Sequence, residues 1–215
     1  MTGYFVTAIG TEIGKTYISA QLLEGWRAAG RTVQAIKPVM SGFGEDALDA
    51  SDAGQLLAAC GRDVAPETVS EICLHRFEAP LAPNVAMRKA GVVQDYGAIL
   101  SFVRGRMEAA GADINLVEGA GGVMSPLTDD RLQIDLMADL GLPVILVAAP
   151  YLGAVSHTLS AIDVLRGRGL EIAQLIISQP DPDSPPPESL GHEVDLFRQV
   201  PWQGVAHGVK VGLLK

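Results

Sequence analysis

A buried strand that runs into a Gly-Lys-Thr turn is the feature that most restricts the fold of this 215-residue chain. Residues 5–9 are apolar apart from Thr7, and Gly14-Lys15-Thr16 opens an amphipathic helical pattern shortly after them. Backbone N–H groups at such a helix start attract phosphate, a lysine adds positive charge, and a threonine hydroxyl can coordinate Mg²⁺. The sequence therefore predicts a nucleotide-phosphate site in an α/β fold.

The spacing of this phosphate loop is unusual. The common loop places a glycine five positions before Gly14, where this chain has Ile9. The nearest glycine is Gly10, and a loop one residue longer would begin at Ala8. The motif therefore predicts a variant phosphate loop, and the backbone path of residues 8–10 stays open.

Composition favours a globular protein. Hydrophobic residues make up 48% of the chain and charged residues 19%, which argues against disorder. The net charge of −9 argues against a general affinity for nucleic acid or anionic membranes, although a local positive site can still bind phosphate. The sequence contains no run of about 18 apolar residues that could span a bilayer, and it begins without a targeting pattern. We therefore expect a cytoplasmic protein.

The cysteines and histidines show no pattern of a metal site. Cys60 and Cys73 lack metal-binding or redox spacing, and the four histidines lack ligand pairing. We expect neutral or buried thiols, and histidines in core, surface or interface positions.

Strand-like and helix-like segments alternate along the chain. We expect strands at 4–9, 33–37, 72–77, 114–117, 143–149 and 172–177, and helices at 16–29, 52–60, 95–110, 131–140 and 155–167. Residues 80–87 and the proline-rich residues 180–187 are expected to be irregular, and the tail after 202 shows only weak patterns. This alternation is typical of a P-loop NTPase-like three-layer fold, with a mostly parallel central sheet and helices on both faces. We expect a single domain over residues 1–215.

Polar and glycine-rich residues gather where the predicted strands end. These clusters lie at 10–16, 37–42, 118–122 and 150–153. Ligands of parallel α/β sheets bind beyond the carboxyl ends of the strands. One shared site is therefore the economical interpretation.

Lys37 and Ser41 follow the second predicted strand, and each admits two interpretations. Lys37 is either an exposed strand-end lysine or a cation that stabilises charge on a transferred phosphoryl group. Ser41 is either a turn-capping residue or a donor to a substrate carboxylate or carbamate. Spacing alone does not decide between them.

Two carboxylates are candidate metal ligands. Glu118 lies at the end of a buried strand, where a phosphate-loop fold carries its second metal-binding carboxylate, and the glycines after it let backbone approach a ligand. Asp52 follows Ser51 at a helix start, where an acid also complements the helix dipole. Thr11 and Glu12 are either site residues or polar loop residues.

Three motifs in combination are specific enough to indicate one protein family. They are Thr-Glu-x-Gly-Lys-Thr at 11–16, Lys-Pro-Val-x-Ser-Gly at 37–42 and Val-Glu-Gly-Ala-Gly-Gly at 117–122. With the segments 142–147 and 200–202 they make the chain resemble, over nearly its whole length, the dethiobiotin synthetases. These ATP-dependent enzymes close the ureido ring in biotin synthesis.

The resemblance implies roles for individual residues. The implied ATP contacts are Glu12, Ile13, Gly14, Lys15, Thr16, Tyr17, Asp52, Glu118, Gly119, Ala120, Gly121, Ser178, Gln179, Pro201, Trp202 and Gln203. Mg²⁺ would be held by Thr16, Asp52 and Glu118, and Lys37 would be catalytic. The implied substrate contacts are Thr11, Lys15, Lys37 and Ser41.

The chain departs from the family pattern at four places. Residues 8–11 read Ala-Ile-Gly-Thr in place of Gly-Thr-Asp-Thr, and Ser178-Gln179 replaces the Asn-Asp pair that reads adenine. Ala-Pro-Asn at 82–84 replaces Ser-Pro-His, and Ser156-His157 replaces Asn-His near the diamine site.

The implied reaction uses ATP, CO₂ or bicarbonate and 7,8-diaminononanoate, in a homodimer. An amine captures CO₂ as a carbamate, ATP phosphorylates the carbamate, and the second amine closes the cyclic urea. Two alternatives are a related ATP-dependent amidoligase that acts on another acid and a nucleotide switch of the partition-ATPase type. The second class usually carries another lysine early in the phosphate loop, and no lysine precedes Lys15.

Overall fold

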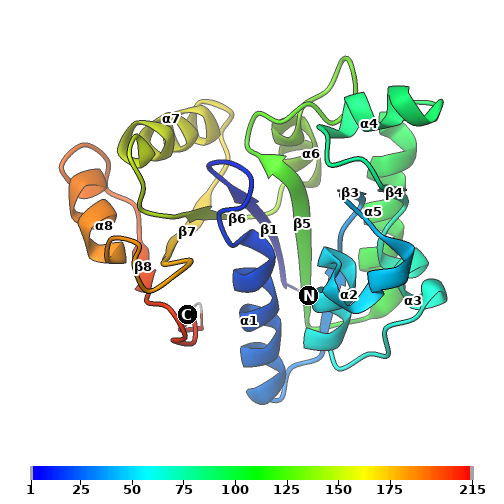
Figure 1. The fold of residues 1–215 in the computed structure, drawn as a ribbon, viewed down its shortest axis with the longest axis horizontal. Helices are drawn as coiled ribbons and strands as arrows, with labels where there is room; N and C mark the ends of the chain where they lie inside the picture. Colours follow the sequence, from blue (N-terminus) through cyan, green and yellow to red (C-terminus); the bar gives the residue numbers. More distant parts are fainter. Residues whose placement is uncertain (1, 214–215) are drawn as a thin grey trace.

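The computed structural model describes residues 2–213 and contains a central sheet of six strands in the order β2-β5-β1-β6-β7-β8 (Figure 1). The strands are β1 Thr2–Ala8, β2 Val33–Ile36, β5 Ile114–Gly122, β6 Val144–Ala148, β7 Ile172–Ser178 and β8 Trp202–Val205. Each neighbouring pair is parallel, which confirms the predicted fold class. A small parallel pair, β3 Val39–Ser41 and β4 His75–Phe77, lies outside this sheet.

Helices cover both faces of the sheet. Side chains of α1 Lys15–Ala28, α2 Asp52–Ala59 and α3 Pro66–Ile72 pack in one core cluster. The other cluster contains side chains of α4 Pro83–Ala90, α5 Tyr96–Ala110, α6 Gln133–Leu140, α7 Ala154–Gly167 and α8 Pro187–Asp195. The strands supply both clusters, because successive side chains point to opposite faces: Phe5 joins the second cluster and Val6 the first. No helix within residues 2–213 is long and apolar enough to cross a membrane.

The structure corrects the sequence-based prediction for residues 72–87. The predicted strand at 72–77 is the end of α3, followed by the three residues of β4. The predicted irregular stretch at 80–87 contains the start of α4, where Pro83 occupies the first turn and Ala86 and Met87 are buried. Proline suits this position because its missing N–H would have no helical partner there.

The last part of the chain is more regular than predicted. The proline-rich segment ends at Pro187, which begins α8. The tail, where the sequence pattern is weak, contains β8. The short 3-10 helix η1 Glu45–Ala50 was also not predicted. Ser51 caps the start of α2, since its Oγ accepts a hydrogen bond from Gly54 N at 3.0 Å.

The path of residues 8–10 is now defined. Ala8 remains in β1, where it pairs with Val147 of β6 and Gly122 of β5. The Ile9 N–H donates to the Val147 carbonyl at 3.0 Å, so the chain leaves the sheet only after Ile9. The strand β5 also runs further than predicted, to Gly122, with a register shift opposite β1.

Candidate functional site

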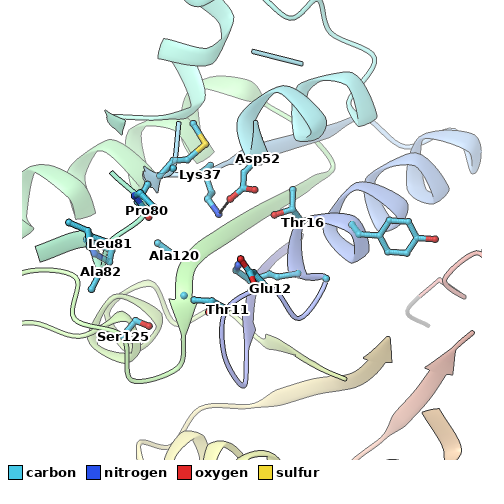
Figure 2. Close-up of a pocket in the computed structure, with 18 residues that line it drawn as sticks. Thr11, Glu12, Thr16, Lys37, Asp52, Pro80, Leu81, Ala82, Ala120 and Ser125 are labelled. Carbon is cyan, nitrogen blue, oxygen red and sulfur yellow. Dashed lines mark ion pairs between the residues drawn. The ribbon is translucent and has the colours of Figure 1, made fainter. Parts of the chain in front are cut away.

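A cavity of about 630 Å³ lies where β1 and β5 end. It is lined by Thr11, Glu12, Gly14, Lys15, Thr16, Tyr17, Lys37, Met40, Ser41, Gly42, Asp52, Pro80, Leu81, Ala82, Pro83, Ala120, Gly121 and Ser125 (Figure 2). The phosphate loop and the start of α1 form one wall, and the segment of residues 80–83 forms another. The predicted clusters at 10–16, 37–42 and 118–122 therefore meet in one site, as the position at the carboxyl ends of parallel strands requires.

Lys37 lies at the centre of the charged groups. Its ammonium is 2.6 Å from Asp52 Oδ2 and 2.6 Å from Glu118 Oε1, and it donates to the Gly119 carbonyl at 3.3 Å. The Lys37 side chain is only 2% exposed, and Glu118 is fully buried. Figure 2 shows the lysine pointing from the end of β2 toward the start of α2. Lys37 is thus not an exposed strand-end residue.

Thr16 completes a set of oxygen ligands. Its hydroxyl donates to Glu118 Oε1 at 2.9 Å, and the other oxygen of this carboxylate, Oε2, is buried without a partner among the described residues. Two carboxylates and a hydroxyl are hard oxygen donors of the kind that Mg²⁺ prefers. Asp52, Glu118 and Thr16 therefore fit a magnesium ion.

The close charges shift the pKa values of the site. Burial alone would lower the pKa of Lys37, but the charges of Glu118 and Asp52 outweigh it and raise this pKa above the usual range. Burial would raise the pKa of Asp52, and the Lys37 charge outweighs it and lowers this pKa. The pKa of Lys15 is lowered by burial and by repulsion from Lys37. Lys37 is therefore a firmly protonated cation.

The phosphate loop depends on the backbone at Gly14. This residue caps the N-terminus of α1 with a φ of 85°, a left-handed conformation that side chains disfavour. A β-carbon there would also lie 3.2 Å from Ser178 Oγ. Glu12 has a positive φ of 56° as well, although it is not glycine. Ile13 does not line the cavity, because its side chain is buried in the core beside α1.

Ser178 and Gln179 lie next to the loop but outside the cavity. Ser178 is buried at the end of β7, beneath Gly14. The Gln179 amide is engaged at both ends, since Nε2 donates to the Ser184 carbonyl at 2.7 Å and Oε1 accepts from His207 N at 3.1 Å. The pair therefore braces the loops after β7 and β8 in this structure.

The structure does not bring Pro201, Trp202 and Gln203 to the cavity. They lie at the start of β8, where Trp202 pairs with Leu175, whereas the carboxyl end of β8 pairs with Ser178. Trp202 Nε1 donates to Asp195 at 2.7 Å, and Gln203 Nε2 donates to the Gly212 carbonyl at 3.1 Å. Ala206 and His207 follow the carboxyl end of β8, and neither of them lines the cavity.

Comparison with known proteins shows the family of this chain. A family model described as an AAA domain matches residues 2–206. The chain is 50% identical over 200 residues to the ATP-dependent dethiobiotin synthetase BioD of Phenylobacterium zucineum, which covers 93% of this chain and 84% of that protein. It is 39% identical to BioD of Methylobacterium nodulans over 97% of this chain and 94% of that protein. The chain belongs to the dethiobiotin synthetase family.

Solved structures with lower identity share the fold. The MinC:MinD cell division protein complex of Aquifex aeolicus matches with a TM-score of 0.56 at 12% identity, covering 96% of this chain and 81% of that one. The signal recognition particle receptor FtsY of Elizabethkingia anophelis matches with a TM-score of 0.50 at 16% identity. This chain is covered completely but spans only 61% of the FtsY chain. Both matches support the α/β fold of this dethiobiotin synthetase family member.

Two departures from the dethiobiotin synthetase pattern lie beside the cavity. Ala82 and Pro83 line it, while the Asn84 amide donates to Asp129 at 3.0 Å. His157 lines a second cavity of about 600 Å³, which shares Thr11 and Ser125 with the first. Met40, inside the predicted cluster at 37–42, also lines the first cavity, and so does Ser125, which was missed because none of the three motifs contains it.

Proposed function

We propose that this chain is an ATP-dependent dethiobiotin synthetase whose reaction takes place in the cavity around Lys37. The observation that supports this most is the contact of one buried lysine with Asp52 and Glu118 directly beside the phosphate loop. The enzyme is a cyclo-ligase that converts 7,8-diaminononanoate, CO₂ and ATP into dethiobiotin, ADP and phosphate. Both relatives described above are named ATP-dependent dethiobiotin synthetases.

ATP binds with its phosphates at the phosphate loop. The N–H groups at the start of α1 and the Lys15 ammonium attract the phosphates, and Tyr17 lines the same wall. Thr16, Asp52 and Glu118 would hold Mg²⁺, which would supply positive charge to the triphosphate.

The diamine binds in the part of the cavity between the phosphate loop and residues 80–83. Thr11 and Ser41 line this part and can hydrogen-bond to the amines and to the carbamate, while Pro80 and Leu81 contribute apolar surface for the carbon chain. The first two chemical steps form the carbamate and then phosphorylate it. One amine attacks CO₂ to give a carbamate, and a carbamate oxygen takes the γ-phosphoryl group from ATP.

Closure of the ring then needs only correct orientation. The second amine attacks the carbamate carbon, the carbon–oxygen bond to the phosphate breaks, and phosphate leaves with that oxygen. Lys15 and Lys37 neutralise the negative charge on the transferred phosphoryl group, and the cavity holds the two amines in place. Lys37 is the catalytic residue of this proposal because its cation would contact the transferred group once it leaves Asp52 and Glu118.

The proposal extends to the domain number, oligomeric state and cellular location of the enzyme. We infer a single domain, a homodimer and a cytoplasmic location, as the family resemblance implies. Dimerisation is testable by sedimentation of the purified chain.

The substrate requirement of phosphate release tests this function. Release from Mg²⁺-ATP should require both diaminononanoate and bicarbonate, and leaving out either one should abolish it. A purified enzyme that releases phosphate without the diamine, in response to an amine donor and another acid, would instead be an amidoligase.

A further inference from the structure

The Lys37 ammonium has a complete set of partners before any ligand binds. An ammonium has three protons, and three acceptors surround it: Asp52 Oδ2 at 2.6 Å, Glu118 Oε1 at 2.6 Å and the Gly119 carbonyl at 3.3 Å. The Thr16 hydroxyl donates to the same Oε1 of Glu118 at 2.9 Å. The lysine therefore occupies the position between the two carboxylates and shares the Glu118 oxygen with Thr16.

This is the position that a magnesium ion would need. Mg²⁺ binds oxygen ligands at about 2.0–2.1 Å and requires a nearly octahedral arrangement. An ion held by Asp52 and Glu118 would therefore lie next to an ammonium that is 2.6 Å from one oxygen of each carboxylate. Two cations at this separation repel strongly in a buried site.

The lysine also cannot serve the transferred phosphoryl group from this position. Its side chain is 2% exposed and all of its acceptors are protein groups. If Lys37 turns toward a phosphate, it leaves two carboxylates, and Glu118 is fully buried. An unpaired buried carboxylate is costly, so another cation must replace the ammonium.

We propose that Lys37 is an internal substitute for the metal: its ammonium fills the magnesium position in the nucleotide-free enzyme and leaves only when ATP and Mg²⁺ arrive together. This inference rests on the metal ligands and the γ-phosphate position of the proposed function. In the exchange the metal takes the two carboxylates and the phosphate takes the ammonium, so each buried charge keeps a partner throughout.

The exchange couples the two ligands. Mg²⁺ alone must displace the Lys37 ammonium, which then has no other anionic partner. The metal therefore binds weakly to the free enzyme. ATP offers the ammonium a new partner and thereby raises the affinity for the metal. Because coupling between binding sites is reciprocal, Mg²⁺ must raise the affinity for the nucleotide by the same factor.

Metal binding to the nucleotide-free enzyme tests the exchange without any turnover. Titration with Mn²⁺, followed by electron paramagnetic resonance, should show weak binding to the wild-type enzyme. Lys37→Met, which removes the ammonium but keeps the length of the chain, should bind Mn²⁺ at least about 100-fold more tightly, because the competing buried ion pair is gone. The Glu118→Gln variant lacks a proposed ligand of this site. The Mn²⁺ binding that it loses therefore identifies the part of the resonance signal that comes from this site.

Lys15→Met is the matched control. It removes a lysine that lines the same cavity and acts on the same carboxylates through its charge. It should change the Mn²⁺ affinity by only about 10-fold or less, since Lys15 exerts its effect without filling the metal position. Equal gains in the Lys15 and Lys37 variants would show a general charge effect and overturn the proposal, and so would tight Mn²⁺ binding to the wild type.

Two crystal structures of the wild-type enzyme avoid the risk that a variant folds poorly. Crystals soaked in Mg²⁺ alone should keep Lys37 on both carboxylates. Crystals with Mg²⁺ and a non-hydrolysable ATP analogue should show the metal there and Lys37 on the phosphates. A metal bound to Asp52 and Glu118 while Lys37 still contacts both would overturn the exchange, whereas dethiobiotin formation would remain a separate question.

Discussion

Lys37 Nζ lies 2.6 Å from Glu118 Oε1 although the two side chains are 2% and 0% exposed. The two residues are 81 positions apart in the sequence and meet because β2 and β5 are neighbours in the sheet. Neither charge has access to bulk water, so each depends on the other. The chemistry of the site and part of its stability thus rest on one pair.

Glu118→Gln should damage both activity and stability. The substitution leaves Lys37 with Asp52 as its only anionic partner and removes a proposed metal ligand. Because one half of a buried ion pair is lost, we expect the free energy of unfolding to fall by about 3 kcal/mol. Urea unfolding measures this change. Asp52→Asn is the control, because the Asp52 side chain is 37% exposed and should cost much less stability. Equal losses in both variants would contradict the role of burial.

Gly14→Ala should weaken ATP binding, while Gly10→Ala should be tolerated. Gly14 has a φ of 85°, and a β-carbon there would crowd Ser178, whereas at Gly10 the nearest side-chain atoms are 3.8 Å away. A left-handed conformation costs a residue with a side chain about 1–2 kcal/mol. Calorimetric titration with ATP should therefore show a loss of affinity of about 10-fold for Gly14→Ala. A comparable loss in Gly10→Ala would contradict this account of the loop.

The enzyme should discriminate weakly between purine nucleotides. The Gln179 amide donates from Nε2 to the Ser184 carbonyl and accepts at Oε1 from His207 N, so contacts within the protein rather than a base fix its orientation. Strong discrimination of about 10⁴ requires a site built to hydrogen-bond the correct group. We expect the ratio of kcat/KM for ATP and GTP to stay below about 100 and to be unchanged in Gln179→Ala. A ratio that collapses in Gln179→Ala would show that this amide reads the base after all.

Cys60 should react slowly with alkylating reagents until the pH is high. Burial raises the pKa of the Cys60 thiol to about 11, and both cysteines are free. The rate of alkylation of the native protein should therefore still rise with pH above 9.0, the usual pKa of a thiol, since only the thiolate reacts. The folded state keeps a proton that the unfolded chain loses, so the thiol's contribution to stability falls as the pH rises from about 9 toward about 11. Alkylation in urea is the control, and a native profile that levels off near 9 would refute the raised pKa.

Local patterns predicted the part of the site that is continuous in sequence. Lys15 and Thr16 were identified because strand, turn and helix follow one another directly. The role of Lys37 stayed open at that stage, since its contacts with Asp52 and Glu118 depend on which strands are neighbours. Spacing along the chain carries no information on that order.

Other differences arose from short elements. Pro83 suggested an irregular stretch, but proline also begins helices, and the buried Ala86 and Met87 decide the matter. Trp202 was assigned to the nucleotide by motif alone. Its place at the start of β8 follows from the register with β7, which a four-residue strand does not reveal by pattern.

Incorporation of carbon-13 from bicarbonate into dethiobiotin tests the central claim most directly. The wild-type enzyme, supplied with Mg²⁺-ATP, diaminononanoate and labelled bicarbonate, should form dethiobiotin that carries the label in its ureido carbon, as detected by mass spectrometry. Lys37→Ala should form at least about 100-fold less, because the cation that stabilises the transferred phosphoryl group is gone, while its ATP affinity falls less. Labelled product from Lys37→Ala at the wild-type rate would contradict the role of this lysine, and a wild-type enzyme that forms no labelled dethiobiotin would contradict the proposed function.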